Sequence, residues 1–321
     1  MSETRILIVQ ENSEIARSIV QEKFPKCEIQ TCSKTDDLKQ LVVEFKPDSA
    51  LLYKLPGLTP EKHQPLFNCK TLKWAHNGGV GIDHLPRWDA NKLAVTNGSG
   101  VLADFMAEYV TGALLMANIG FPQYFRQQRK HKWKMHDWRS VIGQNLLVVG
   151  LGNIGRRVAI RGKQLGVNVS GVRSKPEPTP GIDKVFATDQ LISAVQDADF
   201  VCVHVPSTPK TRQLINAEVF DAMKPNALFI NTARGGVVDQ IALTKALQEK
   251  KIAGAVLDVT EPEPLPQDDP LWDLDNVVIT PHMSDSVSDW EERFAHYFCQ
   301  NLQRFINGTP LENIIDPERG Y

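Results

Sequence analysis

Three side chains in the second half of the chain have the types needed to bind a small acid and to transfer a proton. Arg234 follows the apolar run ALFINTA, Glu263 lies a few residues beyond the run IAGAVLDV, and His282 ends the run NVVITPH. A guanidinium presents a fixed fork of donors that suits a carboxylate or a polarised carbonyl. An imidazole can give or take a proton near neutral pH, and a neighbouring carboxylate would fix its tautomer and favour the imidazolium.

The segment NLLVVGLGNIG at 145–155 predicts a binding site for a dinucleotide. It places an apolar strand before Gly150, Gly152 and Gly155, and the residues that follow show helical spacing. The first glycine permits a tight turn, the second lets the backbone approach a pyrophosphate, and the third lets the helix pack on the strand. With a nicotinamide dinucleotide to supply a hydride, the three side chains above fit reduction of a 2-oxo acid or oxidation of a 2-hydroxy acid.

The residues after the next strand indicate which dinucleotide is bound. Sites that select NAD usually carry Asp or Glu there, because a carboxylate accepts hydrogen bonds from the ribose hydroxyls. Here the strand ends VSGVRSKPEP, so Arg173 holds that position and Ser174 and Lys175 follow. A guanidinium can form charge-assisted hydrogen bonds with a ribose 2′-phosphate, which a carboxylate would repel. The sequence therefore predicts NADP(H) in preference to NAD(H); the alternative is that Arg173 stacks on the adenine and both cofactors bind.

The composition favours a cytoplasmic enzyme that acts on small molecules. The chain has 321 residues, of which 42% are hydrophobic and 23% charged, and this length suits about two domains. A net charge of −2 gives no general attraction for nucleic acid or an anionic membrane, so we expect neither as a partner. We expect no signal peptide and no membrane helix. The five scattered cysteines include no CxxC, which indicates reduced thiols and no metal site.

Alternating strands and helices predict an α/β fold with two Rossmann-like, doubly wound parallel-sheet domains. Four short apolar runs come before residue 100, and six more follow from Leu146. Between them, residues 101–117 are apolar on much of the helical circumference, which suits a buried helix. Residues 287–306 also show a helical stripe and could return the chain to the first domain. We expect a discontinuous substrate domain at 1–98 plus 288–321 and an inserted dinucleotide-binding domain at 99–287.

The order and intervals of the motifs resemble those of the D-isomer-specific 2-hydroxyacid dehydrogenases over nearly the whole chain. The motifs are GLGNIG, VPSTPKT, FINTARGGVVD, LDVTEPEPLP and ITPH. The resemblance implies that Arg234, Glu263 and His282 form the catalytic set, and that the enzyme is a homodimer associating through the cofactor domain. It also implies that backbone amides of the loop 77–81 bind the substrate carboxylate. The expected substrate-binding residues are Asn77, Gly78, Gly79, Val80, Arg234 and His282.

The resemblance extends the expected cofactor contacts to further strand ends. Asp258 is similar to a family residue near the nicotinamide amide, although a buried structural role stays open. We expect Asp285 to cap the helix that follows, and His76, His84 and His204 to be packing or loop residues. The expected cofactor-binding residues are Gly150, Gly152, Asn153, Ile154, Gly155, Arg173, Ser174, Lys175, Val205, Pro206, Thr211, Thr232, Ala233, Asp258 and His282.

The substrate expected from these features is a short 2-oxo acid such as glyoxylate or hydroxypyruvate. Tyr53, Lys54, Leu55 and the loop around Val80 could line the pocket for its side group. Two other functions stay open: oxidation of formate or phosphonate on the same scaffold, and a dinucleotide-sensing binding protein like the transcriptional corepressors among the relatives. The complete set of Arg, Glu and His favours catalysis, with reduction by NADPH as the expected direction.

Overall fold

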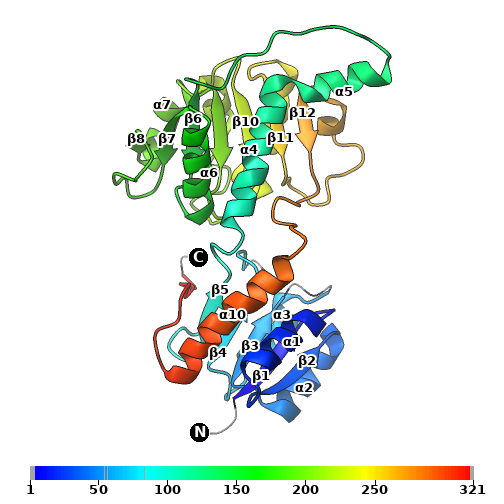
Figure 1. The fold of residues 1–321 in the computed structure, drawn as a ribbon, viewed down its shortest axis with the longest axis vertical. Helices are drawn as coiled ribbons and strands as arrows, with labels where there is room; N and C mark the ends of the chain where they lie inside the picture. Colours follow the sequence, from blue (N-terminus) through cyan, green and yellow to red (C-terminus); the bar gives the residue numbers. More distant parts are fainter. Residues whose placement is uncertain (1–3, 54, 56, 83, 319–321) are drawn as a thin grey trace. The chain divides into compact units, whose positions relative to one another are not determined.

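The computed structural model describes residues 4–53, 55, 57–82 and 84–318 and divides the chain into two compact units, shown in Figure 1. Unit 1 comprises Met1–Val101 and Val287–Tyr321, and unit 2 comprises Leu102–Ser286. Unit 1 is therefore built from two separate stretches of chain, coloured blue to cyan and orange to red in Figure 1. Within the part of the chain that the structure describes, no helix has the length and apolar content needed to cross a membrane.

Unit 1 contains a five-stranded sheet in the order β2-β1-β3-β4-β5, and every pair of neighbouring strands is parallel. Four of its strands correspond to the apolar runs expected from the sequence. The fifth, β2, lies at the edge, and its sequence EIQTC has only its last residue buried, which is why it lacks an apolar run. The strands are β1 (Arg5–Val9), β2 (Glu28–Cys32), β3 (Ser49–Leu52), β4 (Trp74–Asn77) and β5 (Ala94–Asn97).

Helices cover both faces of this sheet. The last helix, α10, packs beside α1, and its Phe298 ring stacks on buried Trp74 with ring centroids 5.0 Å apart. The helix expected at 287–306 begins only at Trp290, with Asp289 as its N-cap residue, so the expectation that Asp285 caps it was wrong. The helices of unit 1 are α1 (Glu14–Lys23), α2 (Leu38–Phe45), α3 (Pro60–Phe67) and α10 (Trp290–Asn307), with a 3₁₀ turn η1 (Thr35–Asp37).

Unit 2 contains a seven-stranded parallel sheet in the order β12-β11-β10-β9-β6-β7-β8. The sequence predicted six of these strands. The missed strand, β8, is a three-residue edge strand with no buried residue, so no apolar run marks it. The strands are β6 (Asn145–Val149), β7 (Asn168–Val172), β8 (Lys184–Phe186), β9 (Phe200–Val203), β10 (Leu228–Asn231), β11 (Gly254–Leu257) and β12 (Val277–Ile279).

The sheet of unit 2 separates two hydrophobic cores, because successive strand residues point to opposite faces. Leu146 and Val148 of β6 pack with α4 and α6, whereas Leu147 and Val149 pack on the face covered by α7, α8 and α9. The helices are α4 (Ala103–Ile119), α5 (Phe121–Arg129), α6 (Asn153–Gln164), α7 (Leu191–Val195), α8 (Ala217–Ala222) and α9 (Gln240–Gln248), with 3₁₀ turns η2 (Thr188–Gln190), η3 (Gly235–Val237) and η4 (Pro270–Asp273). The expected α/β fold with two doubly wound parallel sheets is confirmed.

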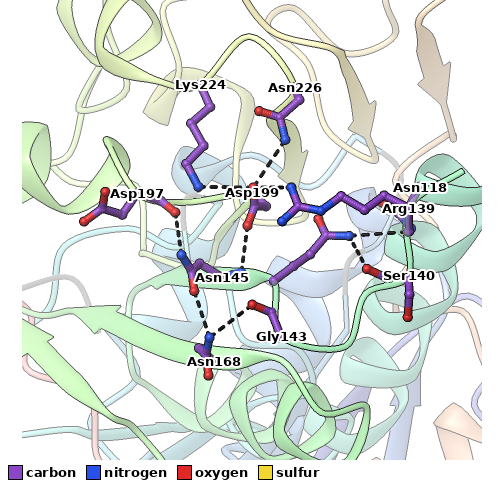
Figure 2. A network of polar contacts seen from close by, with 11 residues as sticks. Asn118, Arg139, Ser140, Gly143, Asn145, Asn168, Asp197, Asp199, Lys224 and Asn226 are labelled. Carbon is purple, nitrogen blue, oxygen red and sulfur yellow. Dashed lines mark hydrogen bonds and ion pairs between the residues drawn. The ribbon is translucent and has the colours of Figure 1, made fainter.

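Both sheets wind outward in two directions from their first strand, β1 or β6. Such an order creates a switch point at the carboxyl end of the first strand, where doubly wound folds bind ligands. At the opposite edge of the unit 2 sheet, a polar network holds the amino ends of β6 and β9 together (Figure 2). Its centre is the carboxylate of Asp199, which is buried and accepts hydrogen bonds from the Asn145 amide at 2.9 Å and from Lys224 at 3.1 Å. Burial alone would raise the pKa of Asp199, but these donors hold it below its ordinary value.

Candidate active site

The glycine turn of unit 2 forms a cradle at the carboxyl end of β6. Gly150 has a φ of 102°, which residues with a side chain rarely adopt, and an added Cβ there would lie 2.7 Å from the carbonyl oxygen of His204. At Gly155 an added Cβ would lie 1.9 Å from the carbonyl oxygen of Gly150, so only glycine lets α6 approach the turn. No described residue comes within 4 Å of a Cβ added at Gly152. The open space beside this backbone, next to the first turn of α6, fits a pyrophosphate.

The end of β7 carries a cation at the position where NAD-selective sites carry an acid. Arg173 follows β7, and its Nη1 lies 3.9 Å from a carboxylate oxygen of Glu177. Ser174 and Lys175 come next and are exposed. An ion pair this long between exposed groups is weak, so the guanidinium can exchange Glu177 for a phosphate at little cost.

The remaining loops of the cofactor edge follow β9 and β10, which are neighbours in the sheet. The Thr211 hydroxyl donates to the carbonyl oxygen of Pro206 at 2.6 Å and accepts from the Thr208 amide at 2.8 Å, which fixes the loop after β9. The Thr232 hydroxyl after β10 lies 3.2 Å from Nδ1 of His204. These two loops carry the expected cofactor residues Val205, Pro206, Thr211, Thr232 and Ala233.

Two histidines at strand ends, the buried His76 and the half-buried His204, are neutral at pH 7. Burial lowers the pKa of His76 in unit 1 to about 3 and that of His204 in unit 2 to about 4. Both therefore fit the packing role that we expected rather than the role of a proton donor. Across the described ranges, no group of three or more His, Cys, Asp or Glu side chains could hold a metal ion.

His282 and Glu263 form the hydrogen bond that their proposed chemistry requires. Nδ1 of His282 lies 2.8 Å from one carboxylate oxygen of Glu263, and both side chains are partly exposed. The other oxygen of Glu263 accepts a hydrogen bond from the Thr260 amide at 3.2 Å, so this carboxylate is itself held in place. The contact places a proton on Nδ1 and leaves the second ring nitrogen, Nε2, for another partner.

The buried carboxylate of Asp258 holds the loop that carries His282. It accepts hydrogen bonds from the Thr280 hydroxyl at 2.7 Å, the Met283 amide at 2.8 Å and the Ser284 amide at 3.0 Å. The carbonyl oxygen of Asp258 also accepts from the His282 amide at 2.9 Å. Asp258 is 2% exposed, so this carboxylate has the buried structural role that the sequence left open.

Arg234 lies beside the loop of Glu263. It follows β10 in an extended conformation, and its Nη1 donates to the carbonyl oxygen of Ala233 at 2.7 Å. A Cβ added at the next residue, Gly235, would lie 2.0 Å from the carbonyl oxygen of Thr260, so the two loops are in backbone contact. Arg234, Glu263 and His282 therefore follow β10, β11 and β12, three consecutive neighbours in the sheet.

The loop expected to bind the substrate carboxylate lies in unit 1, after β4. Gly78 leaves room for the ring of Tyr53, because an added Cβ would lie 2.3 Å from a ring carbon. The side chain of Asn77 is buried and donates to the carbonyl oxygens of Gly79 and Gly81, both at 3.0 Å. The Asn77 side chain is thus bound within the loop and is not exposed for a ligand.

Sequence analysis missed Asn97, whose side chain donates to the carbonyl oxygen of Val80 at 3.0 Å. A signal for it exists, since Asn77 and Asn97 are the last residues of β4 and β5 and are partners in the parallel register. Of the residues expected to line the substrate side-chain pocket, Tyr53 and Leu55 are buried, and Lys54 lies outside the described residues.

Comparison with known proteins places this geometry in a family. Residues 111–284 match the family described as "D-isomer specific 2-hydroxyacid dehydrogenase, NAD binding domain". A glyoxylate reductase from Korarchaeum cryptofilum is 35% identical over 294 residues, which cover 87% of this chain and 86% of the relative. A D-3-phosphoglycerate dehydrogenase from Methanocaldococcus jannaschii is 33% identical over 289 residues, or 87% of this chain, but this chain spans only 54% of that relative.

A solved structure gives the same result for the fold. The D-isomer specific 2-hydroxyacid dehydrogenase from Xanthobacter autotrophicus, in complex with NADPH and MES, is 29% identical with a TM-score of 0.83, and the match covers 100% of both chains. The resemblance inferred from the motifs is confirmed. The chain belongs to the D-isomer specific 2-hydroxyacid dehydrogenases, a family of NAD(P)-dependent oxidoreductases.

Proposed function

We propose that this chain reduces a small 2-oxo acid to the D-2-hydroxy acid with NADPH. The observation that carries the proposal is the 2.8 Å contact between His282 and Glu263, on the same sheet edge as the glycine turn. This pair provides a proton donor whose tautomer is fixed, at the same edge of the sheet as the glycine turn that would hold a nicotinamide dinucleotide. Glyoxylate and hydroxypyruvate are the proposed substrates, and the name of the Korarchaeum cryptofilum relative supports the first of them.

Each of the three side chains has a separate part in this proposal. When bound, the dinucleotide supplies the hydride. Arg234 binds the substrate carboxylate or carbonyl oxygen and stabilises the negative charge that grows there. His282 holds a proton at Nε2 and gives it to the carbonyl oxygen, while Glu263 stabilises the imidazolium before transfer and orients the ring throughout. Backbone amides of the loop 77–81 are the group we propose for binding the substrate carboxylate.

The choice of NADP(H) over NAD(H) rests on the cations after β7. Arg173, Ser174 and Lys175 offer a 2′-phosphate a guanidinium, a hydroxyl and an ammonium, and the Xanthobacter autotrophicus relative holds NADPH. Replacing Arg173 by Asp should reverse the ratio of kcat/KM values for the two cofactors, because a carboxylate repels the phosphate and binds the ribose hydroxyls. An unmutated enzyme that uses NADH as efficiently as NADPH would contradict this part of the proposal.

We also propose that the protein is a homodimer through unit 2. Figure 1 shows α5 and the extended segment that runs back to β6, and this region exposes a group of large apolar side chains. Trp133, for example, is fully exposed, and Met135 is 87% exposed. A monomer rarely leaves so many together in water, and a second copy of the chain could cover them. The group consists of Phe121, Phe125, Trp133, Met135, Trp138 and Ile142.

Light scattering on the purified protein tests the dimer. Replacing Trp133 and Trp138 by Ser should raise the dimer dissociation constant at least about tenfold, since aromatic residues dominate most interfaces. Trp272→Ser is the matched control, because Trp272 is 51% exposed and lies in a different segment, the 3₁₀ turn η4 between β11 and β12. A wild-type protein that is monomeric at micromolar concentration would overturn the proposal.

The five cysteines are all free thiols, which supports a reducing compartment and thus the cytoplasm as the place where the protein acts.

The reaction itself is tested by NADPH absorbance with a panel of 2-oxo acids. Glyoxylate or hydroxypyruvate should be reduced, and His282→Asn should lower kcat by about a hundredfold to ten-thousandfold, the range for loss of a general acid. The affinity for NADPH should change by less than about twofold, because the proton donor acts mainly in the transition state. Tight NADPH binding with no oxidation by any acid would contradict the proposal and favour a dinucleotide sensor.

A further inference from the structure

Three successive carbonyl groups of the loop after β4 are held by two buried asparagines. The Asn77 side-chain amide donates to the carbonyl oxygens of Gly79 and Gly81, and the Asn97 side-chain amide donates to that of Val80, all at 3.0 Å. The carbonyl oxygen of Gly79 accepts a further bond from the Gly98 amide at 3.1 Å. The donors lie close together because Asn77 and Asn97 are register partners on neighbouring strands.

The direction of these carbonyls fixes the direction of the amides that follow them. A trans peptide is planar, with its C=O and N–H pointing to opposite sides. When the carbonyls of residues 79, 80 and 81 point to the asparagines, the amides of Val80, Gly81 and Ile82 must point away from them. None of these three amides has a hydrogen-bond acceptor among the described residues. Successive unpaired amides on one side of a loop make a concavity that favours an anion.

The asparagines themselves are unavailable to a ligand. Asn77 is 1% exposed and uses both hydrogens of its side-chain amide on the loop. Asn97 is 5% exposed, and its side-chain oxygen accepts a bond from the Ser99 amide at 3.1 Å, so only its nitrogen can face Val80. The asparagine end of each bond is buried, so breaking the bond leaves a side-chain amide without water or protein to satisfy it.

We propose that Asn77 and Asn97 are positioning residues that hold the amides of Val80, Gly81 and Ile82 toward the carboxylate of the substrate. The inference rests on the proposed function for the identity of the anion, a 2-oxo acid. It assigns no contact with the substrate to either asparagine. Because only backbone amides meet the carboxylate, this part of the site recognises the acid group whatever side group the substrate carries.

The variant Asn97→Asp tests the proposal at nearly constant shape. An aspartate keeps the oxygen that accepts from the Ser99 amide but cannot donate to the Val80 carbonyl, which frees that peptide to turn. The loop binds the carboxylate in the ground state and the transition state alike, so its loss raises KM more than it lowers kcat. We expect the KM for glyoxylate to rise about tenfold to a hundredfold, the range for hydrogen bonds to a charged group, with kcat within about threefold.

Asn313→Asp is the matched control for the added charge. The side-chain amide of Asn313 donates to the carbonyl oxygens of Ser99 at 2.7 Å and Asn97 at 3.3 Å, and no bond to the loop 79–81 involves it. We expect its KM and kcat for glyoxylate to stay within about threefold of wild type, because its side-chain bonds go to backbone carbonyls outside the loop 79–81. Asn97→Ser is the second test variant, because its hydroxyl is too short to reach the Val80 carbonyl and adds no charge.

Calorimetric binding of oxalate to the NADPH-loaded protein separates this inference from the proposed reaction. Oxalate carries the same carboxylate but cannot be reduced, and its affinity should fall in Asn97→Asp and not in Asn313→Asp. A wild-type protein that binds oxalate but reduces no 2-oxo acid would refute the reaction while supporting the positioning role. Unchanged KM and oxalate affinity in both Asn97 variants, a fall in kcat alone, failure of both variants to fold, or no oxalate binding by wild type would each overturn the inference.

Discussion

The two sheets share their winding but differ in the first loop, and this difference decides which unit can hold a dinucleotide. In unit 2 the chain leaves β6 through Gly150 and Gly152, with open space in front of the second glycine. In unit 1 it leaves β1 through Gln10, Glu11 and Asn12, and the Gln10 side chain is buried and donates to Glu291. This turn carries side chains and the carboxylate of Glu11, which repels a pyrophosphate, where unit 2 has bare glycine backbone. Both doubly wound sheets therefore have a ligand-binding edge at the carboxyl end of the first strand, but only the glycines of unit 2 turn that edge into a nucleotide site.

A second contrast concerns how each unit fixes its functional loop. In unit 1, asparagine amides donate to loop carbonyls, which leaves backbone amides turned outward. In unit 2, the Asp258 carboxylate accepts from the amides of Met283 and Ser284, which consumes backbone amides and leaves the His282 side chain as the active group. The polarity of the buried residue thus determines whether backbone or side chain is presented to a ligand. The following predictions test these two contrasts.

Gly155→Ala should have the largest effect, because its Cβ would lie 1.9 Å from a backbone oxygen that cannot move without disrupting the turn. We expect unit 2 to lose more than about 3 kcal/mol of stability and NADPH affinity to fall more than about a hundredfold. Hydrogen exchange should show weaker protection in unit 2 only. Gly152→Ala is the control: it should fold like wild type, yet bind NADPH at least about tenfold more weakly. If Gly155→Ala bound NADPH with wild-type affinity, the claim that the glycine turn makes unit 2 the dinucleotide site would be wrong.

Acid should destabilise unit 1 before unit 2. Burial lowers the pKa of His63 to about 4 and that of His76 to about 3 in unit 1, whereas unit 2 has His204 at about 4. The pKa of each histidine is lower in the folded protein than its value of 6.5 in the unfolded chain. The stability of the fold that depends on the neutral histidine is therefore complete above pH 6.5 and is lost as the pH falls toward the folded pKa. Protonation of each histidine should lower the free energy of unfolding by roughly 3 kcal/mol between pH 6.5 and pH 4.

Urea unfolding followed by hydrogen exchange at pH 7 and pH 4.5 measures this order. His76→Asn removes one titrating group and keeps an acceptor for the Thr96 hydroxyl, which lies 2.7 Å from Nδ1. Its unit 1 should lose stability less steeply on acidification than that of wild type. Equal pH dependence in the variant and wild type would contradict the assignment to His76.

Asp258→Asn should have an intermediate effect. An asparagine retains one acceptor oxygen but places an N–H donor against the Ser284 amide, which costs about 2 kcal/mol for a buried group. Since the loop of His282 loses its anchor, kcat should fall about tenfold or more while the KM for NADPH changes less. Asp289→Asn, which removes only an exposed pair with Arg293, should change stability by less than about 0.5 kcal/mol. A normal kcat in Asp258→Asn would show that the carboxylate does not hold the loop.

Glu11→Gln should have the smallest effect. Glu11 is exposed, and removal of its charge should change stability by less than about 0.5 kcal/mol. The loop still lacks the glycines of unit 2, so calorimetry should find one NADPH per chain in the variant as in wild type. A second bound NADPH would mean that charge alone, and not the glycine turn, separates the two units.

Local sequence patterns predicted most strands and helices, but missed one edge strand of each sheet, β2 and β8. Central strands such as β9 are buried on both faces and appear as continuous apolar runs. The edge strands β2 and β8 bury few residues, so their sequences carry no such run and they were missed. Asp285 was misassigned as a cap because a helix start is only weakly marked, and α10 begins five residues later, at Trp290.

The amino-acid sequence by itself determined the glycine turn, the cation at the end of β7 and the identities of Arg234, Glu263 and His282, because each depends on residue type and short spacing. Only the tertiary structure decided which distant residues meet. Asn97 reaches Val80 across 17 residues and Thr280 reaches Asp258 across 22, in each case because parallel strands bring their carboxyl ends to one edge. Strand order and register arise from packing of the whole sheet, and no local pattern contains them.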